Sequence, residues 1–396
     1  MYDAIVVGAR CAGSPTALLL ARKGYKVLLL DRANFPSDTV STHYIHQPGV
    51  ASLKRWGLLD RLVATGCPAI GQQVFDVGPF RIEGTPPPSD GVSVGYAPRR
   101  TVLDKLLLDA AVEAGAEFRE QFSVEEVITE GDRVTGIRGR SKGGELVEEK
   151  ARIVVGADGK NSVIAKLVGA PAYAEQPAGS CAYYSYWRDV PMLVAELYPR
   201  PASMLIAAPT HDGLTLLIVY WPEAEFAKVR DDIEGNFMAA LDTVPGLAER
   251  FRAGTRAEKF RGAGDLRGFL RRPHGPGWAL VGDAGYHKDP ITAQGMLDAF
   301  RDADLVAAAV DEGLDDDLDR SLAHFEASRD AAVAAMYDFT CQLAHVELPP
   351  PPEMQQLIAA LVGNQPEIDR FFGVMAGSVS VTDFYAPHNV DRLLAA

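Results

Sequence analysis

Residues 2–32 read YDAIVVGARCAGSPTALLLARKGYKVLLLDR, and this stretch decides the fold. Tyr2 to Val7 is an apolar run typical of a buried strand, Ala12 to Lys23 has the apolar spacing of a helix, and Lys26 to Leu30 predicts a second strand. Strand, helix and strand within about 30 residues have the size of a βαβ unit. The stretch therefore predicts an α/β domain of the dinucleotide-binding, Rossmann-like type.

The joint between the first strand and the helix reads Gly8-Ala9-Arg10-Cys11-Ala12-Gly13, a variant of the phosphate-binding pattern GxGxxG. Gly8 serves the tight turn, and Gly13 lets the helix pack closely, so that backbone N–H groups face a phosphate. Arg10 replaces the middle glycine, which normally permits close backbone approach to a pyrophosphate. Its guanidinium can supply charge to the same phosphates. A plain βα turn without a ligand is the alternative interpretation.

The second strand ends at Asp31-Arg32, about 20 residues beyond the turn. In dinucleotide-binding folds an acid at this distance accepts hydrogen bonds from the ribose hydroxyls. Asp31 is therefore expected to hold the ribose, and Arg32 to belong to the same cofactor site.

Composition excludes several classes of protein. The 396 residues include 39 Lys plus Arg against 53 Asp plus Glu, a net charge of −14, so no general basic field attracts nucleic acid. The four cysteines lie far apart without a CxxC pair, which argues against a disulfide framework or a zinc site, and no metal is expected. With no basic N-terminal region and no run approaching about 18 apolar residues, we expect a cytoplasmic protein without stable membrane insertion.

The hydrophobic pattern divides the rest of the chain into expected helices, strands and connectors. A helix is expected from Thr101 to Gly115, followed by short strands with a hairpin turn at Gly131-Asp132. From about residue 172 to 222 the sequence becomes β-rich and aromatic, which predicts a separate sheet lobe. Trp278 to Val281 predicts a further buried strand, and Met296 to Val310 a helix. The Pro349 to Pro352 run is interpreted as a stiff connector to a helical C-terminal segment.

Three further stretches, together with the first turn, resemble a known family. They are Arg100-Thr101-Val102-Leu103-Asp104, then Gly156-Ala157-Asp158-Gly159-Lys160-Asn161-Ser162, then Gly282-Asp283 through Gln294-Gly295-Met296. Their order resembles that of para-hydroxybenzoate hydroxylase-like FAD proteins, over about residues 2 to 310. That group includes aromatic hydroxylases, some epoxidases, flavin-dependent halogenases and geranylgeranyl reductases.

The resemblance implies a Rossmann-like FAD-binding domain with an inserted β-sheet substrate lobe and a helical C-terminal segment. The FAD-binding domain is expected to comprise residues 1–72, 98–171 and 276–345, the substrate lobe residues 73–97 and 172–275, and the C-terminal segment residues 346–396.

The resemblance also implies roles for individual residues at the cofactor. Gly8, Gly13 and Asp31 would hold the ADP half of FAD, and Gly282-Asp283 would present an acceptor to the ribityl chain. Arg100 would reach the phosphate and ribityl region. The pair Gly295-Met296 would turn its backbone N–H groups to the flavin pyrimidine edge, where a helix N-terminus stabilises the negative charge of the reduced ring. Asp158 resembles the family residue associated with FAD and NAD(P)H, and a turn-forming Asp-Gly is the alternative.

No obligatory acid or base is evident, because the resemblance places the chemistry on the flavin. Candidate catalytic residues are His43 in the loop after the second strand, as a proton relay, and His287 and Pro290 near the isoalloxazine ring. A structural hydrogen bond is the alternative for His287. Lys288 and Asp289 are expected on the surface, paired with each other or with solvent.

Candidate substrate-binding residues come from the aromatic strands. Period-2 alternation groups Tyr183, Trp187 and Tyr220 on one face, or alternatively Tyr184, Tyr186 and Trp221. Tyr184, Tyr220 and Trp221 are the candidates for the pocket, with plain core packing as the alternative. An apolar, aromatic pocket would suit a ring or a polyketide-like substrate.

The resemblance implies an FAD-dependent monooxygenase. In this interpretation NAD(P)H reduces FAD, and O₂ forms a flavin C4a-hydroperoxide that hydroxylates an electron-rich aromatic or polyketide-like molecule. A reductase of isoprenoid double bonds is the alternative. A halogenase is less favoured, because Tyr186-Trp187-Arg188-Asp189-Val190-Pro191 lacks the Trp-x-Trp-x-Ile-Pro pattern. A flavin-binding protein without turnover is the alternative from another class. The sequence leaves open the substrate, NADH or NADPH, the oligomeric state and the need for a separate flavin reductase.

Overall fold

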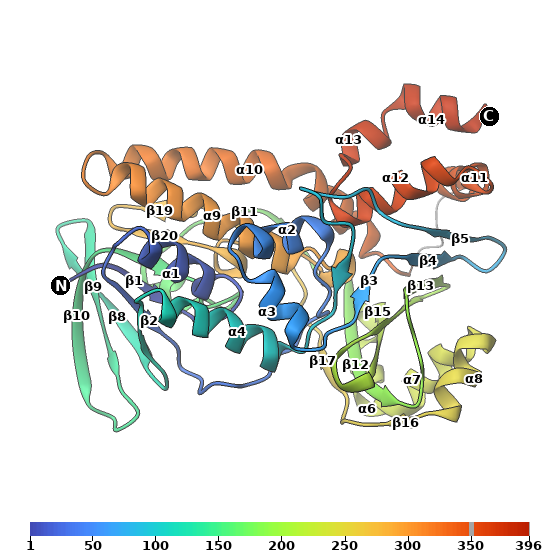
Figure 1. Ribbon diagram of the computed structural model, residues 1–396, viewed down its shortest axis with the longest axis horizontal. Coiled ribbons are helices and arrows are strands. Elements are labelled where there is room, and N and C mark those ends of the chain that lie inside the picture. The colour runs from blue at the N-terminus through green and yellow to red at the C-terminus, as the bar shows by residue number, and fades with distance from the viewer. Residues whose placement is uncertain (348–351, 396) are drawn as a thin grey trace.

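A computed structural model describes residues 1–347 and 352–395, and it divides most of the strands between two large sheets. The first sheet and its helices form the half of the molecule that contains the N-terminus, and the second sheet lies in the half that contains the C-terminus (Figure 1). Residues 349–351 of the expected proline connector lie outside the described residues, and helix α11 begins at Pro352.

The expected βαβ unit is confirmed as β1 (Tyr2–Val7), α1 (Gly13–Arg22) and β2 (Val27–Leu30). In the first sheet, β1 pairs in parallel with both β2 and β10, so that Val6 lies opposite Leu29 on one side and Val155 on the other. Both faces of these strands are buried, which explains their continuous apolar sequence. The expected Rossmann-like fold class is correct.

The first sheet has the order β19-β20-β10-β1-β2-β7, with β8 and β9 extending from β10. The bounds of the added strands are β7 (Glu117–Arg119), β8 (Ser123–Glu130), β9 (Arg133–Arg140), β10 (Leu146–Gly156), β19 (His274–Gly275) and β20 (Trp278–Leu280). The hairpin expected at Gly131-Asp132 joins β8 to β9 and projects at the N-terminal end of the molecule (Figure 1).

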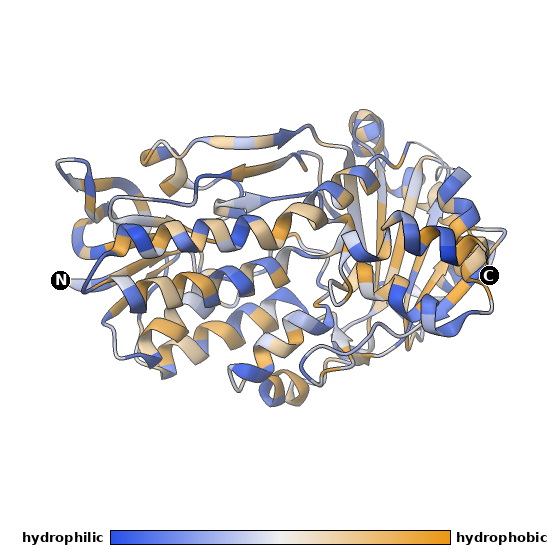
Figure 2. Cartoon of the chain, turned by 90° about the horizontal axis from the view of Figure 1, so that it is seen from above, coloured by the Kyte–Doolittle hydropathy of each residue, from blue (hydrophilic) through white to orange (hydrophobic). Residues whose placement is uncertain are grey.

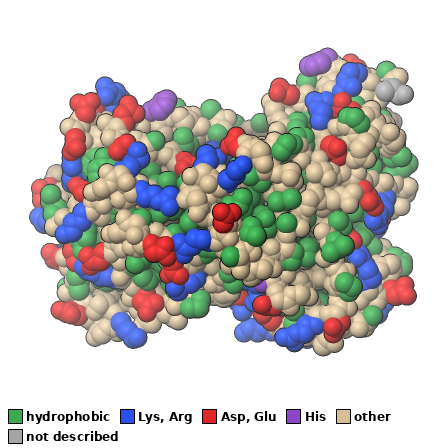
Figure 3. Space-filling model, viewed as in Figure 1, with side chains coloured by type: hydrophobic (Ala, Val, Ile, Leu, Met, Phe, Trp, Pro, Cys, Tyr) green, Lys and Arg blue, Asp and Glu red, His purple; other side chains and the backbone are tan. Residues whose placement is uncertain are grey.

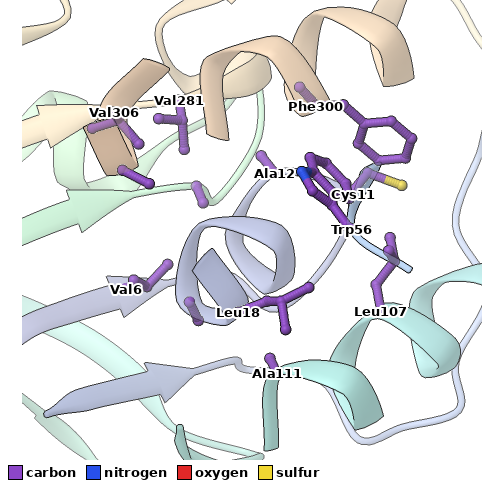
Figure 4. Packing of buried hydrophobic residues seen from close by; sticks show 14 of the residues in the cluster. Val6, Cys11, Ala12, Leu18, Trp56, Leu107, Ala111, Val281, Phe300 and Val306 are labelled. Carbon is purple, nitrogen blue, oxygen red and sulfur yellow. The ribbon is translucent and has the colours of Figure 1, made fainter. Parts of the chain in front are cut away.

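Helices cover the first sheet and enclose its core. Leu18 of α1, Leu107 of α4 (Arg100–Glu113), Phe300 of α9 (Gly295–Gly313) and Val6 of β1 belong to one core cluster, in which Phe300 lies beside Trp56 (Figure 4). Hydrophobic and hydrophilic residues alternate along the helices (Figure 2), as in helices that bury one face. Each fully buried leucine or phenylalanine contributes about 1.5 to 3 kcal/mol, so this layer holds α1 and α9 against the first sheet. The remaining helices of this half are α2 (Gln47–Arg55), α3 (Leu59–Ala64), α5 (Val163–Leu167) and α10 (Leu318–Leu343).

The second sheet has the order β16-β12-β15-β14-β13-β4-β5, with β17 beside β12. Its strands are β4 (Gln73–Asp76), β5 (Arg81–Gly84), β12 (Ser180–Arg188), β13 (Ala195–Arg200), β14 (Ser203–Pro209), β15 (Thr215–Pro222), β16 (Thr255–Arg256) and β17 (Arg261–Ala263). Strands β4 and β5 precede α4 in the chain yet join this sheet, so the lobe is assembled from separate segments. Helices α6 (Phe226–Asp231), α7 (Ile233–Asp242) and α8 (Pro245–Ala253) pack on one of its faces.

The register of this sheet corrects the expected grouping of its aromatic residues. Tyr220 lies opposite Ala182, and Trp221 lies opposite Cys181. Tyr220 therefore shares a face with Tyr184 and Tyr186, while Trp221 joins the face that packs against α7 and α8. Both groupings expected from the sequence are wrong, because they paired the two strands one residue out of register and so exchanged the faces.

Smaller elements connect the two halves. Strands β11 (Ala172–Gln176), β18 (Gly268–Arg271) and β21 (Tyr286–His287) form one small sheet, and β3 (Ala69–Ile70) pairs with β6 (Gly95–Tyr96). The C-terminal helices α11 (Pro352–Leu361), α12 (Gln365–Ala376), α13 (Val381–Phe384) and α14 (Pro387–Leu394) cluster beyond the second sheet (Figure 1).

The charge distribution on the surface and the length of the apolar helices are relevant to binding partners. Acidic and basic side chains are interspersed over the face drawn in Figure 3. Among the described residues, none of the helices combines the length and the apolar character needed to span a bilayer.

Candidate functional site

The turn between β1 and α1 has the shape of a phosphate cradle. Gly8 has φ +107°, and a Cβ added there would lie 2.3 Å from the carbonyl oxygen of Ala157. A Cβ added at Gly13 would lie 1.7 Å from the carbonyl oxygen of Gly8. Glycine is thus required at both positions for the turn to close. No side chain caps the N-terminus of α1, and no hydrogen bond is assigned to the Gly13 N–H within the described residues, so this N–H can face a phosphate.

Asp31 lies at the end of β2 with its carboxylate directed back to this turn. One carboxylate oxygen accepts a hydrogen bond from the Ala9 N–H at 2.7 Å, and the other accepts from the Ala33 N–H at 2.8 Å. Each oxygen retains a further lone pair, so the carboxylate can still accept ribose hydroxyls. Arg32 is exposed, and no hydrogen bond or ion pair is assigned to it within the described part of the chain.

Arg10 turns away from bulk solvent. Its guanidinium contacts Asp104 at 2.6 Å and the hydroxyl of Ser37 at 2.9 Å. Arg100, at the start of α4, binds the same Asp104 carboxylate through two N–H groups, at 2.9 and 3.1 Å. The two arginines expected at the cofactor phosphates therefore lie together. Sequence reasoning gave no role to Asp104, and the spacing of four residues from Arg100 on a helix was the available signal.

Asp283 lies in the turn after β20 with its acceptors free. Its side chain is exposed, although the residues on either side are buried, and no hydrogen bond to it is assigned from the described part of the chain. Gly282 has φ +57°, and a Cβ there would lie 2.8 Å from the Cβ of Ala12, so the turn lies against the first turn of α1. The Gly282 N–H donates to buried Asp302 at 2.9 Å, and this hydrogen bond holds the turn in place on its buried side.

The start of α9 is the third element of the site. Gly295 is exposed, with no atom within 4 Å of an added Cβ, while Met296 beside it is buried. No side chain caps this helix, because the Gln294 amide donates to the carbonyl of Met375 instead. The positive end of a 19-residue helix therefore faces open space. This arrangement fits the pyrimidine edge of a flavin.

Asp158 occupies a structural position. Its carboxylate accepts from the Ser162 hydroxyl at 2.5 Å and from the Val163 N–H at 2.6 Å, so it caps the start of α5. Burial raises the pKa of this carboxyl, and the hydrogen bonds oppose the rise. These contacts match the turn-forming alternative. A contact of Asp158 with a cofactor stays a prediction.

His43 is buried beside the second sheet. Its Nε2 lies 2.7 Å from the hydroxyl of Tyr186, and its Nδ1 has no hydrogen-bond partner among the described residues. The pKa of His43 is lowered to about 3, mainly by burial and in the same direction by the guanidiniums of Arg100 and Arg99. The imidazole is therefore neutral at physiological pH. The guanidinium carbon of Arg99 lies 4.0 Å from the centroid of the Tyr186 ring.

The segment after Asp283 differs from the expectation. Lys288 and Asp289 are both buried, which corrects their expected surface placement. Lys288 pairs with Asp298 of α9, and Asp289 accepts from the hydroxyl of Ser180 at 2.6 Å. They do not pair with each other, because successive residues of an extended segment point to opposite sides.

His287 and Pro290, the other catalytic candidates, are also placed by the structure. A ring nitrogen of His287 lies 2.6 Å from the carbonyl of Arg267, and its ring stacks on Phe269. These contacts match the structural alternative for His287. The Pro290 carbonyl accepts from the hydroxyl of Tyr220 at 3.3 Å, so Pro290 faces the second sheet.

The three substrate candidates divide between the faces of the second sheet. Tyr184 and Tyr220 lie on the face that meets the loops of the cofactor half, where Tyr184 reaches the Thr39 carbonyl at 3.5 Å. Trp221 lies on the opposite face, with its ring centroid 6.2 Å from that of Phe237 of α7. Trp221 therefore lies on the opposite face of the sheet from Tyr184. The third tyrosine on the face toward the cofactor half is Tyr186.

We expect Asp283→Ala to weaken FAD retention about tenfold or more, because a hydrogen bond to a charged group contributes about 1.5 to 3 kcal/mol. The free acceptors of Asp283 are the structural reason. Titration of apoprotein with FAD, followed by flavin fluorescence, measures the change. Unchanged affinity in a folded variant would remove Asp283 from the site.

The family model described as an FAD binding domain matches residues 1–340. The digeranylgeranylglycerophospholipid reductase of Methanosarcina acetivorans is 28% identical over 325 residues, which cover 79% of this chain and 76% of that protein. The kynurenine 3-monooxygenase of Stenotrophomonas maltophilia is 26% identical over 351 residues, which cover 82% and 74%.

Solved structures share the fold. A myxobacterial chondrochloren halogenase superposes with a TM-score of 0.78 at 22% identity, covering 99% of this chain and 95% of that one. PqsL of Pseudomonas aeruginosa, in complex with 2-aminobenzoylacetate, gives a TM-score of 0.74 at 21% identity, covering 87% and 96%. At these identities the likeness shows the fold alone. The expected flavoprotein group, which includes halogenases and geranylgeranyl reductases, is confirmed.

Proposed function

The chain belongs to the FAD binding domain family and is an FAD-dependent oxidoreductase, and from this premise we propose that it is a monooxygenase acting on a ring-bearing small molecule. When bound, FAD supplies the two-electron redox chemistry and the activation of O₂. We propose NAD(P)H as the source of electrons, either directly or through a separate flavin reductase, and the cytoplasm as the place of action.

The residues present fit FAD along its length. The cradle of Gly8 and Gly13 would receive the pyrophosphate, and Asp31 would accept from the ribose. Asp283 would accept from the ribityl chain, and the uncapped start of α9 at Gly295 would stabilise negative charge at the pyrimidine edge. These groups come from three separate segments that the first sheet and its helices hold together.

The observation that carries the proposal is the tyrosine face of the second sheet. Tyr184, Tyr186 and Tyr220 lie together among aliphatic side chains, directed to the loops of His43 and Pro290. Hydrogen bonds between oxygens usually measure 2.5 to 3.0 Å, so the 3.3 Å contact of Tyr220 leaves its hydroxyl weakly engaged, whereas the Tyr184 hydroxyl also has hydrogen bonds with Ser41 and Tyr186. Such a face can exclude water and still bind the polar substituent of an aromatic ring.

Tyr186 and His43 are the groups that can hold a proton in this apolar setting. Burial raises the pKa of Tyr186, so its hydroxyl keeps its proton. The neutral imidazole of His43 shares a hydrogen bond with that hydroxyl through Nε2. We propose that the Tyr186 hydroxyl and Nε2 of His43 share one proton on the side of the site that faces the substrate.

The low pKa of His43 predicts a specific pH dependence. The folded-state pKa of about 3 lies below the ordinary value of 6.5, so the folded protein resists protonation at this position. Its contribution to stability is complete above pH 6.5 and is lost as the pH falls toward 3. The free energy of unfolding of the wild type should therefore approach that of His43→Gln on acidification, by up to about 1.4 kcal/mol per pH unit. Urea denaturation at pH 4, 5 and 7 tests this. A constant difference would indicate a solvated His43.

A reductase of isoprenoid double bonds is the second candidate. The observation in its favour is the similarity to several digeranylgeranylglycerophospholipid reductases, at 27 to 29% identity over most of the chain. A hydrocarbon chain offers no partner to the hydroxyl of Tyr220, which is why the tyrosine face supports the monooxygenase.

Labelled O₂ distinguishes the two functions. Purified holoenzyme is supplied with NADH or NADPH, with and without an added flavin reductase, and with a panel of phenols, indoles, polyketide-like rings and isoprenoid lipids. A monooxygenase places one labelled oxygen atom in the product for each O₂ consumed. Conversion of an isoprenoid without label and without O₂ would reject the monooxygenase and favour the reductase.

A further inference from the structure

We propose that Asp104 is a positioning residue that holds Arg10 and Arg100 together as a clip for the pyrophosphate of FAD. The proposal explains how the chain dispenses with the middle glycine of its phosphate-binding turn. It rests on FAD binding, which the proposed function also requires, and it does not depend on which substrate is oxidised.

The geometry of the clip is specific. Asp104 is fully buried on α4, one turn beyond Arg100. Its two oxygens accept from the Nε and one terminal nitrogen of Arg100, in the fork-to-fork arrangement that fixes both groups in one plane. One of these oxygens also accepts from Arg10 at 2.6 Å. A single carboxylate thus fixes the direction of two guanidiniums that come from different segments.

The charges of the clip favour a dianion. Two guanidiniums and one carboxylate leave a net charge of +1 in a buried setting, where Coulomb interactions are screened less than in water. Although burial opposes its charge, Asp104 holds the pKa of Arg100 above its ordinary value, so Arg100 keeps its proton. Cys11 beside them stays a neutral thiol, because burial raises its pKa. The FAD pyrophosphate carries two negative charges, so the clip would attract it and neutralise one of them.

The clip also lies where the pyrophosphate is expected. Arg10 belongs to the phosphate turn itself, between Gly8 and Gly13. Arg100 lies close enough to Asp283 for that carboxylate to contribute to the raised pKa of Arg100. The clip therefore spans from the phosphate turn toward the ribityl acceptor. Arg10 is also tied to Ser37 through two hydrogen bonds, which limits its freedom before the cofactor arrives.

The competing explanation is that Arg10 only neutralises a buried acid. The two explanations predict opposite results for Asp104→Asn. Removing a negative charge near a phosphate would by electrostatics alone tighten FAD binding. Loss of the anchor would release both guanidiniums and weaken FAD binding despite the more favourable charge. The sign of the change therefore identifies the role.

We expect Asp104→Asn to raise the FAD dissociation constant at least tenfold, measured by titrating apoprotein with FAD. Asp109→Asn is the matched control, because Asp109 pairs with Lys105 on the same helix at the same spacing but on the exposed side. The control should leave the constant within twofold of the wild type. An unchanged or smaller constant in Asp104→Asn overturns the proposal.

Arg10→Gln provides the second measurement and decides the matter if Asp104→Asn does not fold. The Arg10 side chain of the wild type is 24% exposed, and in the variant Arg100 remains to neutralise Asp104. The clip predicts about fivefold weaker FAD binding, partial rescue by Arg10→Lys, and a smaller effect of added salt than in the wild type. It also predicts no further loss when Arg10→Gln is added to Asp104→Asn. An unchanged FAD affinity in Arg10→Gln overturns the clip.

These titrations need no substrate and no turnover. A negative result with labelled O₂ would therefore reject the monooxygenase and leave the clip untouched. Failure of the wild type to bind FAD would reject both and is visible in the reference titration. Failure of the clip alone appears as wild-type affinity in the variants.

Discussion

Gly13→Ala is expected to abolish the retention of FAD during purification. The added Cβ would lie 1.7 Å from the carbonyl oxygen of Gly8, and real Cβ atoms do not approach backbone oxygens below about 3 Å. That oxygen belongs to the chain backbone and cannot rotate away as a side chain would. The turn must open, and opening it moves the N–H groups of α1 away from the position of the pyrophosphate. Absorbance of the purified protein near 450 nm, against protein concentration, measures the loss.

Gly143→Ala is the matched control for this variant. Gly143 lies in the exposed turn between β9 and β10, with no atom within 4 Å of an added Cβ and no positive φ. The control should keep its flavin. Circular dichroism of both variants separates local opening of the turn from global unfolding. A yellow, folded Gly13→Ala protein would show that the phosphate turn tolerates a different path.

The glycine turn between β1 and α1 could be predicted from the sequence because it is local, while its contact with a cofactor stays a prediction. Gly8 and Gly13 are required by contacts within the turn and with the neighbouring strand, and Asp31 follows at the end of the next strand. Hydrophobic period and glycine spacing report directly on such elements. The fold class, the hairpin at Gly131-Asp132 and the helix that begins near Met296 were correct for the same reason.

The substrate side could be predicted only in part. Period-2 alternation shows which residues of one strand share a face, but it does not show how two strands are registered. A shift of one residue between β12 and β15 placed Trp221 with Tyr184 in the expectation, whereas the structure pairs Trp221 with Cys181. The hydrogen bond from Tyr186 to His43 joins residues 143 apart in the chain, and no local pattern announces it.

Buried charged side chains were the second group of residues that could not be predicted from the sequence. Lys288, Asp298 and Arg301 lie within 14 residues, and on composition alone they belong on a surface. In the structure Asp298 accepts from both cations at the first turn of α9, and Lys288 also donates to the hydroxyl of Tyr286 at 2.7 Å. Although burial raises it, the two cations lower the pKa of Asp298 below its ordinary value. The cluster forms because each charge has a partner, which composition does not reveal.

Removal of Asp298 should therefore be among the most destabilising substitutions in the protein. Asp298→Leu leaves the ammonium of Lys288 buried without its partner, and breaking a buried pair in this way costs about 3 to 5 kcal/mol. Lys288→Met should cost less, because Arg301 remains paired with Asp298. The free energies of unfolding from urea denaturation at pH 7 should fall in this order, with the wild type highest.

The double variant Lys288→Met with Asp298→Leu decides whether the unpaired charge is the cause. Removing both partners leaves Arg301 near the carboxylate of Asp302, so the remaining charges still balance. We expect the double variant to recover most of the stability that Asp298→Leu loses, since apolar residues of similar volume often replace a buried ion pair at little cost. Because Asp298 lies in the first turn of α9, the same order should appear in FAD retention. A double variant as unstable as Asp298→Leu would show instead that Asp298 acts through the shape of the helix start and not through its charge.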